Sequence, residues 1–381
     1  MSDFHQFGLI TTLHQLGSDT TLPQRHRSLL TSTNQSALVL PCHSADLDTP
    51  AFHNILTQLT ESPAFQPLLI SINGFEEKEA PEIVHFFKKY PDLPLTLLLN
   101  HQQSIQQIQT QLSLSSLPAG KGYNVWTAIG HLLKSRFQGA ITLHDCDIRT
   151  YSPDLPLRLA FPVLEKDMHY IFSKGYYHRA TTRLFGRVTR LFFAPLLQAI
   201  IRLYGHHPLL DFLEAFRYPL AGEISFHSSL APDLEFAPGY SLETAMLCST
   251  YHLLEPERVC QVDLGLDFDH RHHPVGESPT QKGLTAMCCE IAKTLFHYLQ
   301  KEGLPLGTEQ FPAISQFYLT AAQHAILRSS HICKLNNIPF DASEEHETVN
   351  KFSTALTAAF PPASPPPLLP AWNLCQLTVD S

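Results

Sequence analysis

The sequence predicts an α/β fold built on a mainly parallel sheet, and two observations lead to this prediction. Short apolar runs alternate with segments of helical spacing over the first 150 residues, as in successive βαβ units. The chain has 381 residues, of which 44% are hydrophobic and 16% charged, as in globular proteins. At this length we expect one large α/β part with a smaller layer added to it.

The expected elements of the first part follow one another in a regular order. Strands are expected at residues 36–41, 67–72, 95–99 and 139–143, and helices at 50–61, 77–90 and 125–137. Pro41 is expected to end the first strand, because proline has no N–H to donate to a sheet. Residues 1–35 are polar, and we expect an extended arm or one short element there.

The remainder of the chain is mixed in pattern. Alternating apolar residues predict strands within 158–178, and helical spacing predicts helices at 189–217, 281–302 and 309–333. The segment 361–367 contains five prolines, so we expect a stiff segment that packs along the surface. We expect three parts, with bounds 1–150, 151–280 and 281–381.

Charge and composition exclude several classes of function. The formal net charge is −9, from 26 basic and 35 acidic residues, and no basic stripe is present, which disfavours a nucleic acid partner. The most apolar stretch, 191–204, is too short to cross a bilayer, so no membrane span is expected. The eight cysteines form no CxxC pair, and no signal peptide is recognisable. We therefore expect a reduced, cytoplasmic location.

Polar side chains follow the expected strands at one edge of the sheet. The loop that begins at Pro41 contains Asp46, Asn73 follows the second strand, and Asp145 and Asp147 follow the fourth. Parallel sheets bind their ligands at the carboxyl ends of their strands. These loops are therefore expected to converge on one ligand site.

The two aspartates suit a hard divalent cation such as Mg²⁺ or Mn²⁺, which prefers oxygen ligands. For an isolated Asp-x-Asp, a plain strand-end turn ranks first. An aspartyl-nucleophile phosphatase is disfavoured, because Arg149 stands where that class has Thr or Val. Lys121 lies between two glycines ahead of a helix, where it can supply charge to a phosphate. A simple turn is the alternative reading of that segment.

The segment 267–274 contains three histidines and two aspartates, which can supply a further metal ligand. A solvated polar loop is the alternative. Zinc is disfavoured, because no cysteine stands near the segment.

These motifs, in this order, resemble those of the glucosyl-3-phosphoglycerate synthases, which are retaining glycosyltransferases of the GT-A fold. The resemblance runs from about Pro41 to about Pro274, and its segments are 120–122, 145–147, 174–179, 186–189, 219–223, 237–243 and 261–270. It implies a Rossmann-like, nucleotide-sugar-binding half at 1–150. It further implies an acceptor-binding half at 151–280 that completes the metal site, followed by a helical region at 281–381.

The resemblance also implies roles for individual residues. The metal ligands are implied to be Asp145, Asp147 and His270, and the shifted spacing leaves Asp269 and His272 as alternatives for the third. The donor-binding residues are implied to be Pro41, Asp46, Asn73, Lys121 and Asp145. The catalytic residues are implied to be Glu243, Leu220 and Lys121. The acceptor phosphate is implied to bind Gly186, Arg187 and Thr189, and the planar guanidinium of Arg187 independently suits phosphate.

The activity that the resemblance implies is transfer of glucose from UDP-glucose to 3-phosphoglycerate, for compatible-solute synthesis. It implies a front-face mechanism with Mg²⁺ or Mn²⁺. A different donor such as GDP-mannose, or another acceptor such as glycerate, glycerol phosphate or a sugar, is the runner-up. A catalytically silent protein that binds a nucleotide-sugar is the alternative from another class, because the loop after Pro41 lacks the family's Glu. A homodimer formed through 189–204 or the C-terminal third is also considered.

Overall fold

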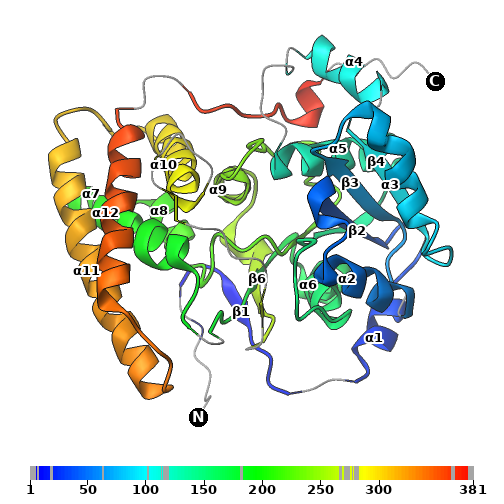
Figure 1. Ribbon diagram of the computed structural model, residues 1–381, viewed down its shortest axis with the longest axis horizontal. Coiled ribbons are helices and arrows are strands. Elements are labelled where there is room, and N and C mark those ends of the chain that lie inside the picture. Colours follow the sequence, from blue (N-terminus) through cyan, green and yellow to red (C-terminus); the bar gives the residue numbers. More distant parts are fainter. Residues whose placement is uncertain are drawn as a thin grey trace.

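The computed structural model describes the chain except for residues 1–5, 7, 18–19, 62–63, 101–102, 113, 115–119, 181–182, 266–267, 270–274, 277, 279–282, 362–364 and 376–381. Its centre is an eight-stranded sheet of order β1-β8-β6-β7-β5-β2-β3-β4 (Figure 1). The strands are β1 Thr11–Leu13, β2 Gln35–His43, β3 Leu68–Asn73, β4 Leu95–Leu99, β5 Gly139–Leu143, β6 Phe172–Tyr176, β7 Ile224–His227 and β8 Val259–Asp263. Only β7 runs antiparallel to its neighbours, so the mainly parallel sheet is confirmed.

Strand β2 shows why the early strands read as continuous apolar runs. Leu38 and Leu40 belong to one hydrophobic core, and Ala37 and Val39 belong to the other. Helices cover both faces of the sheet, so every position along such a strand is buried. The sheet draws its strands from before and after residue 150, and β7 separates β6 from β5.

One expectation for the sheet is wrong in detail. Strand β2 does not end at Pro41 but continues to His43, with Pro41 opposite Ser71 of β3. Strand β5 pairs with β2 only as far as Val39, so Pro41 faces no ladder partner on that side. The N-terminal segment also contributes strand β1, which pairs in parallel with β8 at the edge of the sheet.

The three helices that the apolar spacing predicts in the first part are present: α2 Pro50–Glu61 has the expected bounds, and α3 Ala80–Phe87 and α5 Lys121–Lys134 have shifted ends. Helices α1 Leu22–Ser28 and α4 Gln103–Gln111 were not predicted, and short turns lie at η1 Ser44–Asp46 and η2 Glu77–Glu79. Helix α5 starts four residues before the expected 125, with Gly120 at its N-cap. Lys121 is therefore the first residue of a helix rather than part of a preceding loop.

The strands expected within 158–178 are only partly present. Residues Asp154–Leu164 form helix α6, followed by turn η3 Lys166–Met168 and strand β6. Leu155, Leu157 and Leu159 are all buried, because α6 packs against the sheet on one side and α1 on another. A helix buried around most of its circumference shows apolar residues at every second position, which imitates a strand.

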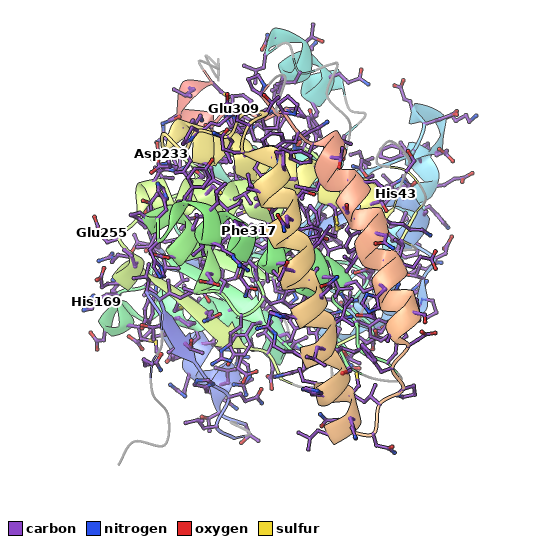
Figure 2. The ribbon with its side chains drawn as sticks, turned by 90° about the vertical axis from the view of Figure 1, so that its left-hand side faces the viewer. His43, His169, Asp233, Glu255, Glu309 and Phe317 are labelled. Atoms are coloured by element: carbon purple, nitrogen blue, oxygen red, sulfur yellow. The ribbon has the colours of Figure 1, made fainter. Side chains whose placement is uncertain are left out.

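The remaining helices form a layer beside the sheet, on the left in Figure 1. The π-helical turn η4 Val188–Phe193 continues into α7 Ala194–Tyr204, and the other helices are α8 Pro208–Glu214, α9 Leu242–Leu253, α10 Leu284–Lys301, α11 Phe311–Leu335 and α12 Ala342–Ala358. Figure 2 shows α11 and α12 side by side, and both contact η4. The buried apolar residues of segment 189–204 therefore belong to the core of the protein.

The chain beyond the proline-rich segment packs onto α5, whereas residues 362–364 of that segment lie outside the described residues. Trp372, in turn η6 Trp372–Leu374, stacks on Trp126 with ring centroids 4.1 Å apart. The Trp126 ring N–H donates to the Pro370 carbonyl, and the Trp372 ring N–H donates to the Trp126 carbonyl. Among the helices that the structure describes, none combines the length and apolar character that a bilayer crossing requires.

Candidate active site

A lysine held between two carboxylates occupies the carboxyl edge of the sheet. The Lys121 Nζ atom lies 2.6 Å from Asp145 Oδ1 and 2.8 Å from Glu243 Oε1. Burial alone would lower the pKa of Lys121, but the two carboxylates outweigh burial and raise that pKa well above its ordinary value. The cluster therefore presents a fixed, permanently charged ammonium group at the N-terminus of α5, where a helix already favours anions.

Two glycines bring this helix end against the segment that carries Glu243. A Cβ atom at Gly120 would lie 2.4 Å from the Pro238 carbonyl oxygen, and one at Gly122 would lie 1.8 Å from the Ala237 carbonyl oxygen. Any side chain at either position would therefore push the two segments apart. Glu243 follows in the first turn of α9, so this close approach sets its distance from Lys121.

A third glycine allows the ammonium group to pack closely against the backbone. A Cβ atom at Gly222 would lie 2.5 Å from Lys121 Nζ and 2.8 Å from both carboxylate oxygens of Asp145. Gly222 therefore places bare backbone directly against the charged cluster. Any side chain at this position would displace Lys121 or Asp145.

The loops after β2 and β3 converge on the same edge, as expected. The Asn73 amide donates to the Gly120 carbonyl at 3.2 Å, which ties the end of β3 to the start of α5. The hydroxyl of Ser44 donates to the Gly74 carbonyl at 2.5 Å. Asp46 accepts a 3.8 Å contact from the thiol of Cys146, the residue between the paired aspartates. The structure therefore brings Asp46, Asn73, Lys121 and Asp145 to one site.

The chemistry of Asp147 fits a bound cation. Its Oδ1 atom is buried and has no hydrogen-bond partner among the described residues. Burial, and then the negative charge of Asp145, raise the pKa of Asp147 to about 7, while Lys121 opposes the shift. A cation would stabilise the ionised form of this buried carboxylate, and Asp145 lies beside Asp147, where it can bind the same cation.

The expected third ligand cannot be placed. His270, and its alternative His272, lie outside the described residues. The other alternative, Asp269, accepts a hydrogen bond from Arg149 at 3.2 Å. Within the part of the chain that the structure describes, no group of three His, Cys, Asp or Glu residues is positioned to hold an ion.

Two further buried charged residues lie beneath the site, and the sequence alone assigns neither of them a role. Lys174 of β6 is 1% exposed, and its ammonium group donates to the carbonyl of Ala221. Glu223 is fully buried, and burial followed by the charge of Asp145 raises its pKa to about 7. Burial lowers the pKa of Lys174 to about 8, against the attraction of Glu243 and Glu223. The segment between Leu220 and Glu223 is thus held from below by a charged donor.

The expected acceptor residues lie at the start of η4. Gly186 has φ +73°, a left-handed conformation that favours glycine, and a Cβ atom there would lie 3.6 Å from the Tyr218 hydroxyl. Arg187 follows as the N-cap of η4, and Thr189 lies within it. Leu220 follows Tyr218 by two residues, so the turn at Gly186 lies near the segment that leads to Gly222.

Comparison with known sequences gives relatives of one kind. The chain is 32% identical over 364 residues to the glucosyl-3-phosphoglycerate synthase of Persephonella marina, which covers 94% of this chain and 90% of that protein. It is 29% identical over 366 residues to the synthase of the same name from Methanococcoides burtonii, which covers 94% and 89% of the two chains. No protein-family model matches the sequence.

Solved structures show the same fold. A glucosyl-3-phosphoglycerate synthase from Mycobacterium tuberculosis, in complex with phosphoglyceric acid, has a TM-score of 0.54 at 22% identity and covers 76% of this chain and 88% of its own. A mannosyl-3-phosphoglycerate synthase from Rubrobacter xylanophilus has a TM-score of 0.56 at 23% identity and covers 77% and 82%. The sheet and its helical layers are therefore a GT-A glycosyltransferase fold. From its sequence relatives, the chain belongs to the glucosyl-3-phosphoglycerate synthase family of glycosyltransferases.

Proposed function

We propose that the protein transfers glucose from UDP-glucose to 3-phosphoglycerate in a cation-dependent reaction that retains the anomeric configuration. Its relatives carry the name of this reaction, and solved neighbours were crystallised with Mn²⁺, UDP-glucose and phosphoglyceric acid, or with Mg²⁺ and UDP. The observation that carries the proposal is Lys121, bridged by Asp145 and Glu243 at a helix N-terminus beside bare backbone at Gly222. This arrangement suits a diphosphate whose negative charge grows as its bond to the sugar breaks.

In this proposal the donor binds across the loops at the carboxyl edge of the sheet. The loop from Pro41 to Asp46, together with Asn73, forms the nucleoside side of the site. The ammonium group of Lys121 and the N-terminus of α5 bind the diphosphate. A divalent cation, held by Asp145 and Asp147, would add positive charge to the same diphosphate. His270 is proposed as the third ligand.

The reaction is proposed to occur on the face of the sugar from which the diphosphate leaves. The acceptor hydroxyl gives its proton to the departing phosphate oxygen, the sugar–phosphate C–O bond breaks, and a new C–O bond forms to the acceptor on that face. Lys121 stabilises the leaving diphosphate, and Glu243 holds Lys121 and faces the transferred sugar. The Leu220 backbone, fixed by the bond from Lys174 to Ala221, borders the reacting carbon. Gly186, Arg187 and Thr189 bind the acceptor phosphate.

The donor sugar is the main alternative to test, since one solved neighbour is a mannosyl-3-phosphoglycerate synthase. The experiment supplies 3-phosphoglycerate and Mn²⁺ with either UDP-glucose or GDP-mannose, and follows nucleoside diphosphate release. Proton NMR of the product gives its anomeric configuration. We expect a glucosylated product with retained configuration, and acceptor-free reactions provide the control. Absence of product with both donors would overturn the proposal.

We further propose that the protein works in the cytoplasm. The structure leaves all eight cysteines as free thiols, which is consistent with a reduced compartment.

A homodimer is proposed through the C-terminal helices, because Leu327, Ile332 and Leu335 of α11 are exposed. Sedimentation at micromolar protein concentration tests the dimer, and a monomer would refute it. The division into parts at residues 150 and 280 is proposed to follow the donor and acceptor halves of the reaction.

A further inference from the structure

The first turn of α12 sets two carboxylates against the arginines around η4. Arg187 Nη2 lies 2.5 Å from Glu344 Oε1, and Arg183 Nη2 lies 3.2 Å from the same oxygen. Arg190 donates through both of its terminal nitrogens to the two carboxylate oxygens of Glu345. Three arginines therefore face two glutamates, and the cluster keeps a net positive charge.

The two glutamates differ in how firmly they are held. Glu345 is 6% exposed and forms a two-point pair with Arg190, which also donates to the Ser329 hydroxyl. This pair belongs to the packing of α12 against η4 and α11. The side chain of Glu344 is 45% exposed, and its one contacting oxygen serves both Arg183 and Arg187. Glu344 is therefore the carboxylate that a competing anion can replace.

The backbone under Glu344 is fixed while its side chain can turn away. Asp341, the N-cap of α12, accepts hydrogen bonds from the backbone N–H groups of Ser343 at 2.9 Å and Glu344 at 3.1 Å. The Glu344 carbonyl accepts a bond from Thr348 at 2.8 Å. Helix α12 also packs beside α10 and α11 (Figure 2). Rotation of one half-exposed side chain would thus open the cluster without moving the helix.

The paired arginine is the one proposed to bind the acceptor phosphate. The side chain of Arg187 is only 11% exposed, so an incoming anion and Glu344 must share a small accessible surface on it. Arg187 also follows Gly186, whose turn approaches the Tyr218 hydroxyl on the way to the reacting segment. Resting on the function proposed above, we propose that Glu344 occupies the acceptor's anion site and competes with the incoming phosphate for Arg183 and Arg187.

The charge of a phosphate monoester lets it displace Glu344 from the arginines. A phosphate monoester carries about −1.5 to −2 charges near pH 7 and presents three strong acceptor oxygens, whereas a carboxylate carries one charge. Phosphate can therefore bind both Arg183 and Arg187 with more charge than Glu344 supplies. An acceptor whose only anionic group is a carboxylate, such as glycerate, replaces one singly charged group with another, so it binds the arginines little better than Glu344 does. Every anion that enters the site must displace the same carboxylate, so Glu344 weakens the binding of each by the same factor, and the preference for phosphate comes from the arginines.

The test measures binding of 3-phosphoglycerate, and separately of inorganic phosphate, by calorimetry on the full chain. The variant is Glu344→Gln, which keeps the shape and removes the charge. Glu347→Gln is the matched control, because Glu347 lies on the same helix and is 67% exposed in a pair with Lys351. Exposed ion pairs are weak, so we expect Glu344→Gln to bind both anions roughly two- to fivefold more tightly. The control should match the wild type.

Steady-state kinetics separates competition from a structural role. Glu344→Gln should lower KM for 3-phosphoglycerate and leave kcat unchanged. Weaker or unchanged anion binding in this variant would overturn the inference, since Glu344 would then support Arg187 or have no influence on it. Tighter anion binding without sugar transfer would keep the competition and refute the proposed function. If the enzyme transfers sugar but Glu344→Gln leaves anion binding unchanged, the proposed function stands and the competition is refuted.

Discussion

The replacement Gly222→Ala tests the donor site with one methyl group. The added Cβ atom would lie 2.5 Å from Lys121 Nζ and 2.8 Å from both carboxylate oxygens of Asp145. Ordinary carbon contacts begin near 3.5 Å. The ammonium group must therefore move by roughly 1 Å, which disturbs its pairing with Asp145 and Glu243. The neighbouring atoms are the ends of side chains, so we expect the fold to tolerate the change.

The cost of this displacement should appear in catalysis rather than in folding. Misplacing a catalytic group by about 1 Å can reduce the rate roughly 100-fold. That factor corresponds to about 2.7 kcal/mol of transition-state stabilisation. The assay is nucleoside diphosphate release under saturating acceptor, together with calorimetric UDP binding. We expect kcat/KM for the donor to fall by this order and UDP to bind more weakly.

A matched replacement excludes a general effect of adding a methyl group. Gly17→Ala introduces a Cβ atom with nothing within 4 Å, so its kinetics and melting temperature should equal those of the wild type. If Gly222→Ala melts like the wild type and turns over the donor at an undiminished rate, Lys121 and Asp145 are not the groups that hold the diphosphate. Loss of activity together with loss of folding would instead show that our expectation of tolerance was wrong.

Three further predictions concern groups away from the open face of the site. Lys174→Met removes the charged group that donates a hydrogen bond to the Ala221 carbonyl. Because a hydrogen bond from a charged group contributes about 1.5–3 kcal/mol, kcat should fall roughly 10- to 100-fold with little change in KM. An unchanged kcat would refute this prediction. Helix propensity alone would make Gly130→Ala more stable by about 1 kcal/mol, but the added Cβ atom would lie 2.1 Å from the Trp372 ring. Urea unfolding should therefore show a lower free energy of unfolding, and a higher one would contradict the packing of Trp372 on α5. Burial, followed by the charge of Arg27, lowers the pKa of His26 from 6.5 to about 4, so the unfolded chain binds the proton first as pH falls. The free energy of unfolding should therefore drop by at most about 3 kcal/mol between pH 6.5 and pH 4. His26→Gln should make the free energy of unfolding less dependent on pH over this range, and an unchanged pH dependence would contradict the role of His26.

The parts of the fold that were predictable are those in which burial follows a simple period. Strand β4 and strand β5 have the bounds that their apolar runs predict, because both faces of the sheet are covered. Helix α6 differs from the expected strand because most of its circumference is buried, which hides the helical period. Strand β1 was missed because three residues at a sheet edge carry too little pattern, and its partner β8 lies far along the chain.

Residues of the candidate site could be predicted from the sequence where a local pattern marks them, but not where their contacts are distant in sequence. Asp145 and Asp147 could be found because they follow a strand directly, and Lys121 because glycines flank it. The burial of Lys174 and Glu223 could not be read, since charged residues are almost never fully buried and their partners come from other segments. The only local signal for Glu223 was its place directly after Gly222. Glu344 meets Arg187 across 157 residues, a distance that no motif spans.

The central claim is that Asp147 holds a cation for the nucleotide diphosphate, and UDP binding tests it most directly. Calorimetric titration of UDP should be performed with and without Mn²⁺ on the wild type and on Asp147→Asn, which keeps the size and removes the charge. Because hard cations require oxygen ligands with negative charge, we expect Mn²⁺ to tighten UDP binding at least tenfold, on the order of 1.4 kcal/mol, in the wild type. The variant should lose this cation dependence while keeping its fold. Cation-dependent UDP binding that survives in Asp147→Asn would contradict the account.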